Sequence, residues 1–292
     1  MPNLQLSLGV SPIDTVTIQE QQFHIKRDDQ LHPVFNGNKA RKFLHYLHLQ
    51  EPRIKSVISF GGNQSNAMMC LSALAKIKHW HFNYYLKKLP EQLKTNPTGN
   101  FKTACENGMQ YHEVSEFPSL HSTSDCIVIP QGGACAKAEY GIRLLADEIN
   151  QWVEHQQIDD CSLFLPSGTG TTAFYLQQHT LLPVYTTPCI GNSNYLQKQW
   201  NRLNISAKRY PSIIAPNHQS RFGQPDTEYL AIWQYLLETT GIEFDLLYDP
   251  PGWITLLKNR HLLTQNVIYI HCGGIVGNQS MLDRYKHFSE RK

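Results

Sequence analysis

The chain has 292 residues and a formal net charge of +2, with 26 lysines and arginines against 24 aspartates and glutamates. This length supports one large domain or two modest ones, and the small charge argues against nucleic acid as a partner. No apolar run reaches the roughly 18 residues of a membrane helix, and the first residues lack the basic and apolar segments of a secretory signal. The sequence therefore predicts a cytoplasmic protein that binds neither nucleic acid nor membrane.

The seven cysteines are widely spaced and include no CxxC pair. An odd number without such a pair favours free thiols in a reducing compartment over a disulfide framework. The fourteen histidines form no HExxH motif and no paired Cys/His spacing, so we expect no metal site.

Strand and helix patterns alternate along most of the chain, which is typical of an α/β fold with parallel strands. The N-terminal part differs, because residues 16–18 and 22–25 predict a short strand pair. Apolar residues at helical spacing predict helices over residues 40–47, 142–153 and 230–237. Gly241 follows the last of these in the position of a helix C-cap.

Four short apolar segments stop at a glycine-rich cluster and are followed by a helical pattern. They cover residues 57–60, 126–129, 162–165 and 267–270. Buried parallel strands are continuous apolar runs, and the loops at their carboxyl ends bind ligands in open α/β sheets. The four segments together predict a sheet edge built around a small anionic ligand.

The loop at residues 167–172 (SGTGTT) is the richest in hydroxyl groups and precedes a predicted helix. Small residues let a ligand approach the backbone, and a helix N-terminus offers unpaired N–H groups to an anion such as phosphate. The loop lacks the lysine of a P-loop and the spacing of a dinucleotide fingerprint. An ordinary helix after a tight turn is the structural alternative.

Lys39 follows Asn36-Gly37-Asn38 at the predicted start of a helix. A helix N-terminus and a closed cleft both disfavour a protonated amine, and a lysine with a lowered pKa suits Schiff-base chemistry. The alternative is that Lys39, Arg41 and Lys42 form a solvated basic face.

Six motifs in sequence order then resemble one known family. They are residues 36–44 (NGNKARKFL), 60–66 (FGGNQSN), 129–134 (IPQGGA), 166–172 (PSGTGTT), 244–249 (FDLLYD) and 269–274 (YIHCGG). The sequence is similar to the 1-aminocyclopropane-1-carboxylate deaminase and D-cysteine desulfhydrase family, which are pyridoxal-phosphate enzymes with the tryptophan-synthase β-subunit type of fold. The resemblance implies two open, mostly parallel sheets flanked by helices. A small domain of residues 45–137 would be inserted in a large cofactor-binding domain of residues 1–44 and 138–292.

The resemblance also implies a role for each matching residue. Lys39 would bind the aldehyde of pyridoxal 5'-phosphate and shuttle a proton, and Asn66 would bind the ring hydroxyl. Gln64 and Ser65 would bind the substrate carboxylate, and Ser65 and Tyr248 would also act in catalysis. The phosphate would be held by Ser167, Gly168, Thr169, Gly170 and Thr171. A strand residue packed on the sheet is the alternative for Tyr248.

The sequence departs from the family pattern at three positions. Phe222 stands where the family usually has a second active-site tyrosine, so it would line the substrate site without a hydroxyl. Asp249 follows Tyr248 where deaminases tend to carry glutamate and desulfhydrases threonine. Cys272 stands where desulfhydrases carry threonine beside the pyridine nitrogen, and the sequence leaves open whether Asp249 or Cys272 reaches that nitrogen.

The resemblance implies a deaminase or lyase that acts on a small amino acid and releases ammonia and a 2-oxo acid. Family members often form dimers, so the resemblance also allows a homodimer. Two other hypotheses remain. One is a non-catalytic protein that binds the cofactor or a metabolite on the same fold, which is motivated by Phe222 and by the altered stretch after Tyr248. A nucleotide-binding α/β enzyme would use the loop at residues 167–172, but no acidic metal-binding partner accompanies that loop.

Overall fold

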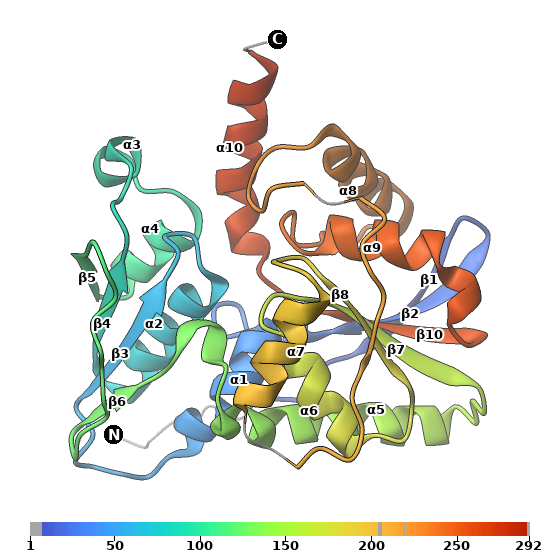
Figure 1. The fold of residues 1–292 in the computed structure, drawn as a ribbon, viewed down its shortest axis with the longest axis horizontal. Helices are drawn as coiled ribbons and strands as arrows, with labels where there is room; N and C mark the ends of the chain where they lie inside the picture. The colour runs from blue at the N-terminus through green and yellow to red at the C-terminus, as the bar shows by residue number, and fades with distance from the viewer. Residues whose placement is uncertain (1–7, 204–205, 219, 291–292) are drawn as a thin grey trace.

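The protein is built from two mostly parallel sheets flanked by helices, as the resemblance implied (Figure 1). The computed structural model describes residues 8–203, 206–218 and 220–290. Each sheet packs its own hydrophobic core, and β7, which is buried along its whole length, shows why a central parallel strand has no polar face.

The larger sheet has the strand order β1-β2-β10-β7-β8-β9. Its strands are β1 (Ile13–Ile18), β2 (Gln21–Arg27), β7 (Cys161–Ser167), β8 (Val184–Pro188), β9 (Ser212–Ile213) and β10 (Asn266–His271). β1 pairs antiparallel with β2, which confirms the predicted N-terminal strand pair, and the other neighbours are parallel. The N-terminal pair therefore extends the larger sheet at its β10 edge.

The smaller sheet has four parallel strands in the order β5-β4-β3-β6. They are β3 (Ser56–Gly61), β4 (His81–Leu86), β5 (Met109–Glu113) and β6 (Cys126–Val128). All four lie within residues 45–137, although the boundaries of the inserted domain remain a prediction.

The helices confirm the three helical predictions and the glycine that ends the third. The helices are α1 (Gly37–His48), α2 (Asn66–Lys78), α3 (Glu91–Thr95), α4 (Gly99–Glu106), α5 (Glu139–His155), α6 (Thr171–His179), α7 (Ser193–Arg202), α8 (Thr227–Thr240), α9 (Asp249–Lys258) and α10 (Asn278–Ser289). Gly241 takes the left-handed conformation after α8. In the described part of the chain, no helix has the length and apolar character needed to cross a membrane.

The four glycine-terminated segments are all strands, but they do not share one sheet. β3 and β6 belong to the smaller sheet, and β7 and β10 belong to the larger one. The loops that follow all four strands nevertheless line the same cleft. The expectation of a single sheet edge is wrong, whereas the expectation that the four loops meet at one site is correct.

A buried ion-pair cluster ties α1 to the larger sheet and to α5. The guanidinium of Arg41 donates to both oxygens of Asp28, at 2.9 and 3.1 Å, and to both oxygens of Glu148, at 2.6 and 2.7 Å. Lys26 of β2 donates to the same Glu148 at 2.6 Å. Arg41 is 1% exposed and Lys42 is 3% exposed, so the solvated basic face considered for this segment does not exist.

Candidate active site

The loops at the carboxyl ends of the strands enclose a cleft of about 450 Å³. The cleft receives residues from both sheets, including the loops after β3, β6, β7 and β10 and the first turn of α1. Lys39, Ser65, Thr169, Tyr248 and Cys272 all line it. Residues that are far apart in the sequence are therefore brought to one site. The other site residues predicted from the sequence also line the cleft: Gln64, Asn66, Ser167, Gly168, Gly170, Thr171, Phe222 and Asp249.

Lys39 projects from the first turn of α1, which is docked on the end of β10. The backbone N–H of Asn38 donates to the carbonyl of Cys272 at 3.0 Å. Gly37 has φ +66°, and a Cβ there would lie 2.1 Å from that same carbonyl oxygen, so only glycine allows the approach. The Lys39 amine donates to Asn38 Oδ1 at 2.8 Å, and burial lowers its pKa below the ordinary value.

Lys42 is a second cleft lysine, which the sequence analysis did not assign to the site. It lies one helical turn after Lys39, and its amine donates to the carbonyl of Gly132 at 3.1 Å. Burial, followed by the charge of Lys39, holds its pKa well below the ordinary value. A Cβ at Gly132 would lie 3.2 Å from the Thr169 side chain, so the loop after β6 packs between Lys42 and the hydroxyl-rich loop.

The hydroxyl-rich loop turns into α6 at Gly170, which has φ +70°. The first N–H groups of a helix have no intrahelical partner, so this turn presents free donors to the cleft. Thr169 and Thr171 share a hydrogen bond of 2.9 Å, and the Ser167 hydroxyl is bonded to Thr186 at 2.6 Å. Thr172, which the sequence analysis did not assign, lines the cleft with a buried hydroxyl that has no hydrogen-bond partner among the described residues.

The loop after β3 forms the N-terminus of α2. Ser65 is the N-cap, and its hydroxyl accepts from the backbone N–H of Met68 at 3.4 Å. The Gln64 amide donates to the carbonyl of Thr98 at 3.0 Å, which holds that side chain against the smaller sheet's helical layer. A helix N-terminus with this lining favours a carboxylate.

Asp245 is an acidic cleft residue that lay inside a recognised motif but received no role. Its Oδ2 accepts from the Asn66 amide at 2.9 Å, and its Oδ1 accepts from the backbone N–H groups of Leu247 and Tyr248 at 2.7 and 2.9 Å. A Cβ at Gly274, which has φ +96°, would lie 2.3 Å from Asp245 Oδ2. Asp245 therefore joins the loop after β3 to the turn that carries Tyr248, and burial raises its pKa.

Tyr248 precedes α9 as its N-cap and does not belong to a strand, so the alternative of a packed strand residue is wrong. Its ring packs against Phe222 with centroids 5.2 Å apart and an interplanar angle of 57°. Phe222 is 41% exposed at the mouth of the cleft. Burial, followed by the charge of Asp245, raises the pKa of Tyr248, so its hydroxyl keeps its proton at neutral pH.

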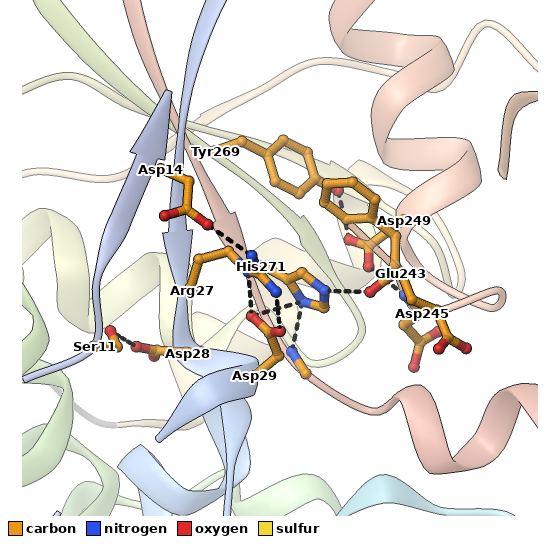
Figure 2. Close-up of polar contacts among 12 residues, drawn as sticks. Ser11, Asp14, Arg27, Asp28, Asp29, Glu243, Asp245, Asp249, Tyr269 and His271 are labelled. Atoms are coloured by element: carbon orange, nitrogen blue, oxygen red, sulfur yellow. Dashed lines mark hydrogen bonds and ion pairs between the residues drawn. The ribbon is translucent and has the colours of Figure 1, made fainter. Parts of the chain in front are cut away.

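Asp249 is completely buried, and both of its carboxylate oxygens have partners (Figure 2). The Tyr269 hydroxyl donates to Oδ1 at 2.6 Å, and the backbone N–H of Asp245 donates to Oδ2 at 2.8 Å. Burial raises the pKa of Asp249 to about 7. Cys272 also lines the cleft, and burial raises the pKa of its thiol, so that group is neutral.

His271 is the last residue of β10, and both of its ring nitrogens have hydrogen-bond partners (Figure 2). Its Nδ1 accepts from the backbone N–H of Gly273 at 3.1 Å, which assigns the ring proton to Nε2 and makes Nε2 the donor to the carbonyl of Glu243 at 2.8 Å. The ring stacks on Phe244 at 4.8 Å. The imidazole therefore fixes the glycine turn at the end of β10.

Replacing Asp249 by asparagine should flatten the dependence of stability on pH. With a folded pKa of about 7 and an ordinary value of 3.8, the folded carboxyl keeps its proton where the unfolded one has lost it. Its contribution to stability therefore falls as the pH rises between these two values. Urea titrations at several pH values give the free energy of unfolding of both proteins without cofactor. We expect the difference, Asp249→Asn minus wild type, to increase by about 2 kcal/mol between about pH 5 and pH 7.5, because only the wild type loses this contribution.

Asp147→Asn, which changes an exposed aspartate of α5, serves as the control and should leave the pH dependence unchanged. Equal pH slopes for Asp249→Asn and the wild type would contradict the raised pKa.

In the described ranges, no group of three or more histidine, cysteine or acidic side chains could hold a metal ion. All seven cysteines, which lie in those ranges, are free thiols.

Comparisons with known proteins found relatives of low sequence identity that align with nearly the whole chain. No protein-family model matches the sequence. The chain is 23% identical to a protein of Thermotoga maritima with the provisional name 1-aminocyclopropane-1-carboxylate deaminase, and the alignment covers 94% of this chain and 96% of that protein. It is 21% identical to a rice protein with the provisional name D-cysteine desulfhydrase 2, mitochondrial, over 92% of this chain and 81% of that protein.

Solved structures agree on the fold. A crystal structure described as an ACC deaminase homologue superposes with a TM-score of 0.77 at 19% identity and covers 97% of this chain and 95% of that one. A crystal structure of a threonine deaminase gives a TM-score of 0.66 at 12% identity, with 91% and 92% covered. These similarities agree with the resemblance that the motifs carry to the 1-aminocyclopropane-1-carboxylate deaminase and D-cysteine desulfhydrase family of pyridoxal-phosphate enzymes.

Proposed function

We propose that the protein is a pyridoxal-phosphate-dependent deaminase or carbon–sulfur lyase that acts on a small amino acid and releases ammonia and a 2-oxo acid. The observation that carries this proposal is the position of Lys39, whose amine has a lowered pKa and lies in the same cleft as the N-terminus of α6. A lowered pKa increases the share of the amine that is unprotonated, and only the unprotonated amine attacks an aldehyde.

The residues of the cleft fit the cofactor. A phosphate needs several hydrogen-bond donors, and the first turn of α6 supplies N–H groups together with the unpartnered hydroxyl of Thr172. Gly168 leaves the space open, because a Cβ there would lie 3.3 Å from the Tyr248 hydroxyl. Lys42 adds a buried amine donor beside the loop after β6. We propose that this donor set, with Ser167, Gly168, Thr169, Gly170 and Thr171, holds the phosphate.

When bound, the cofactor withdraws electrons from the Cα of an amino acid that is attached through its amino group. Lys39 would take up and return the proton of that Cα, because its amine is held in the cleft by Asn38. Ser65 and the N-terminus of α2 would bind the substrate carboxylate, beside Gln64. Asn66, fixed by Asp245, would donate to the ring hydroxyl.

Asp249 and Cys272, which both line the cleft, are the two candidates for the pyridine nitrogen. Both oxygens of Asp249 already accept hydrogen bonds, and the Cys272 thiol is neutral. Since the pKa of Asp249 is about 7, its carboxyl is divided between neutral and charged forms at neutral pH. We propose that the charge of the Asp249 carboxyl determines how strongly the cofactor would withdraw electrons, and so whether the site favours ring opening or elimination.

We expect Tyr248→Phe to lower kcat about a hundredfold while the visible spectrum of the bound cofactor stays unchanged. Phe222 supplies no hydroxyl to the stacked pair, so Tyr248 is the member that can donate a proton to the substrate or leaving group. Steady-state assays on the best substrate would measure the loss. Tyr195→Phe, which changes another tyrosine of the cleft lining, is the matched control, and an equal loss in both variants would show that the Tyr248 hydroxyl has no special role.

A non-catalytic cofactor-binding protein on the same fold is the second candidate, and the exposed phenyl ring of Phe222 at the cleft mouth favours it. A panel of D- and L-amino acids with 1-aminocyclopropane-1-carboxylate, assayed for 2-oxo acid release, separates the two functions. Release from any member supports the enzyme, whereas cofactor colour without turnover supports the binding protein. A protein that stays colourless after addition of pyridoxal phosphate would contradict both.

The domain boundaries at residues 44/45 and 137/138, the possible homodimer and the cytoplasmic location are part of the same proposal. The free cysteines support a reducing compartment, and the confinement of the smaller sheet to residues 56–128 supports the insertion.

A further inference from the structure

Arg284 is a cation of the cleft that the proposed chemistry does not use. It belongs to α10, which rises between α4 and the α8 side of the molecule (Figure 1). Its Nη1 donates to the carbonyl of Gly223 at 2.8 Å and lies 3.7 Å from Met281 Sδ. A Cβ at Gly223 would be 3.2 Å from Nη1, so the glycine leaves room for the guanidinium beside Phe222.

Arg284 also has unused donors. Within residues 8–203, 206–218 and 220–290, no carboxylate forms an ion pair with it, and its Nη2 and Nε have no hydrogen-bond partner. This differs from Arg41 and Arg27, whose guanidinium groups are saturated by carboxylates. An arginine fork held at the mouth of a cleft with free N–H groups is suited to bind a carboxylate or another planar anion.

A side cavity of about 350 Å³ opens next to the cleft at this position. Four residues line both spaces, namely Asn63, Gln64, Ser280 and Arg284. The Gln64 amide donates to Thr98, and the Ser280 hydroxyl donates to Gly277. Arg284 is therefore the charged donor at the junction.

No acidic side chain lines both spaces. Asp283 lines the side cavity alone, and Asp245 and Asp249 line the cleft alone. An anionic group at the junction would therefore contact Arg284, and no carboxylate of the residues shared by the two cavities would repel it. The side cavity adds room for a side chain longer than that of a minimal amino acid.

We propose that Arg284 binds an anionic group at the end of the substrate side chain, so that the preferred substrates are amino acids with an acidic side chain. This inference rests on the proposed function, which assigns the α-carboxylate to Ser65 and the N-terminus of α2. Arg284 is then a specificity-determining residue at the junction of the two cavities.

The test compares acid and amide pairs of nearly equal shape: aspartate with asparagine and glutamate with glutamine, each as both enantiomers. Isothermal titration calorimetry on the protein loaded with pyridoxal phosphate gives Kd, and initial rates give KM for any pair that reacts. We expect the acid of at least one pair to bind roughly tenfold more tightly than its amide. In Arg284→Gln this preference should disappear while the affinity for the amide stays within about twofold, and Arg284→Lys should keep part of it.

Arg143→Gln, which changes an exposed arginine of α5, is the matched control and should leave every affinity unchanged. Equal affinity for acid and amide in the wild type would overturn the inference, as would a preference that survives in Arg284→Gln or an absence of binding by every pair. An equal loss for acid and amide in that variant would instead assign Arg284 to the α-carboxylate. Absorbance of the bound cofactor, recorded on the same samples, separates these outcomes from failure of the proposed function.

Discussion

Lys39→Ala should lower turnover by roughly a thousandfold or more and should remove the borohydride-reducible bond between the protein and its cofactor. The amine lies in the cleft on the first turn of α1, and burial lowers its pKa. Alanine removes the amine that would both bind the aldehyde and move the Cα proton. Single-turnover assays and mass spectrometry after borohydride reduction measure the two effects separately.

Lys42→Met is the matched control because Lys42 is also a buried cleft lysine, one turn later on the same helix. We expect it to retain the reducible bond but to bind the cofactor more weakly, since the Lys42 amine beside the Gly132 carbonyl would no longer be there to donate to the phosphate. An adduct that persists in Lys39→Ala and disappears in Lys42→Met would exchange the roles of the two residues.

Glu148→Gln should destabilise the folded protein by about 3 to 5 kcal/mol, because it removes one partner from a buried ion-pair cluster. Glu148 accepts two hydrogen bonds from Arg41 and one from Lys26, and these two cations are nearly inaccessible to solvent. Glutamine keeps one acceptor oxygen but replaces the other by an N–H donor and removes the negative charge, so one of the buried N–H groups of Arg41 or Lys26 loses its acceptor. Urea unfolding monitored by circular dichroism gives the free energy.

Glu154→Gln changes an exposed glutamate of the same helix and should shift the free energy of unfolding by no more than about 0.5 kcal/mol. The cluster also fixes α1, so Glu148→Gln should reduce cofactor affinity in step with stability. A Glu148→Gln protein as stable as Glu154→Gln would show that the cluster is not needed to hold α1.

The local features of the fold were predictable because each depends on a short stretch of sequence. Apolar runs that stop at glycine predicted β3, β6, β7 and β10, and helical spacing predicted α1, α5 and α8. The division of these strands between two sheets was not predictable from the runs themselves, since a buried strand has the same pattern in either sheet. The resemblance to a known family supplied that information.

In the candidate site, too, local motifs were predictable and contacts between distant parts of the chain were not. Lys39 and the loop at residues 167–172 were identified by motifs, but Lys42 was considered part of a solvated face because charge alone does not reveal burial. Asp245 lay inside the motif FDLLYD, yet its hydrogen bond to Asn66 spans 179 residues of sequence. Arg284 lies outside all six motifs, and it reaches the cleft only because of the way α10 packs.

The most direct test of the central claim is peptide mapping of the wild-type protein after incubation with pyridoxal phosphate and reduction with borohydride. We expect a visible absorbance band before reduction and a single modified peptide that carries the phosphopyridoxyl group on Lys39. Modification of another lysine in place of Lys39, or a protein with neither absorbance nor adduct, would contradict the assignment of Lys39 as the cofactor-binding lysine.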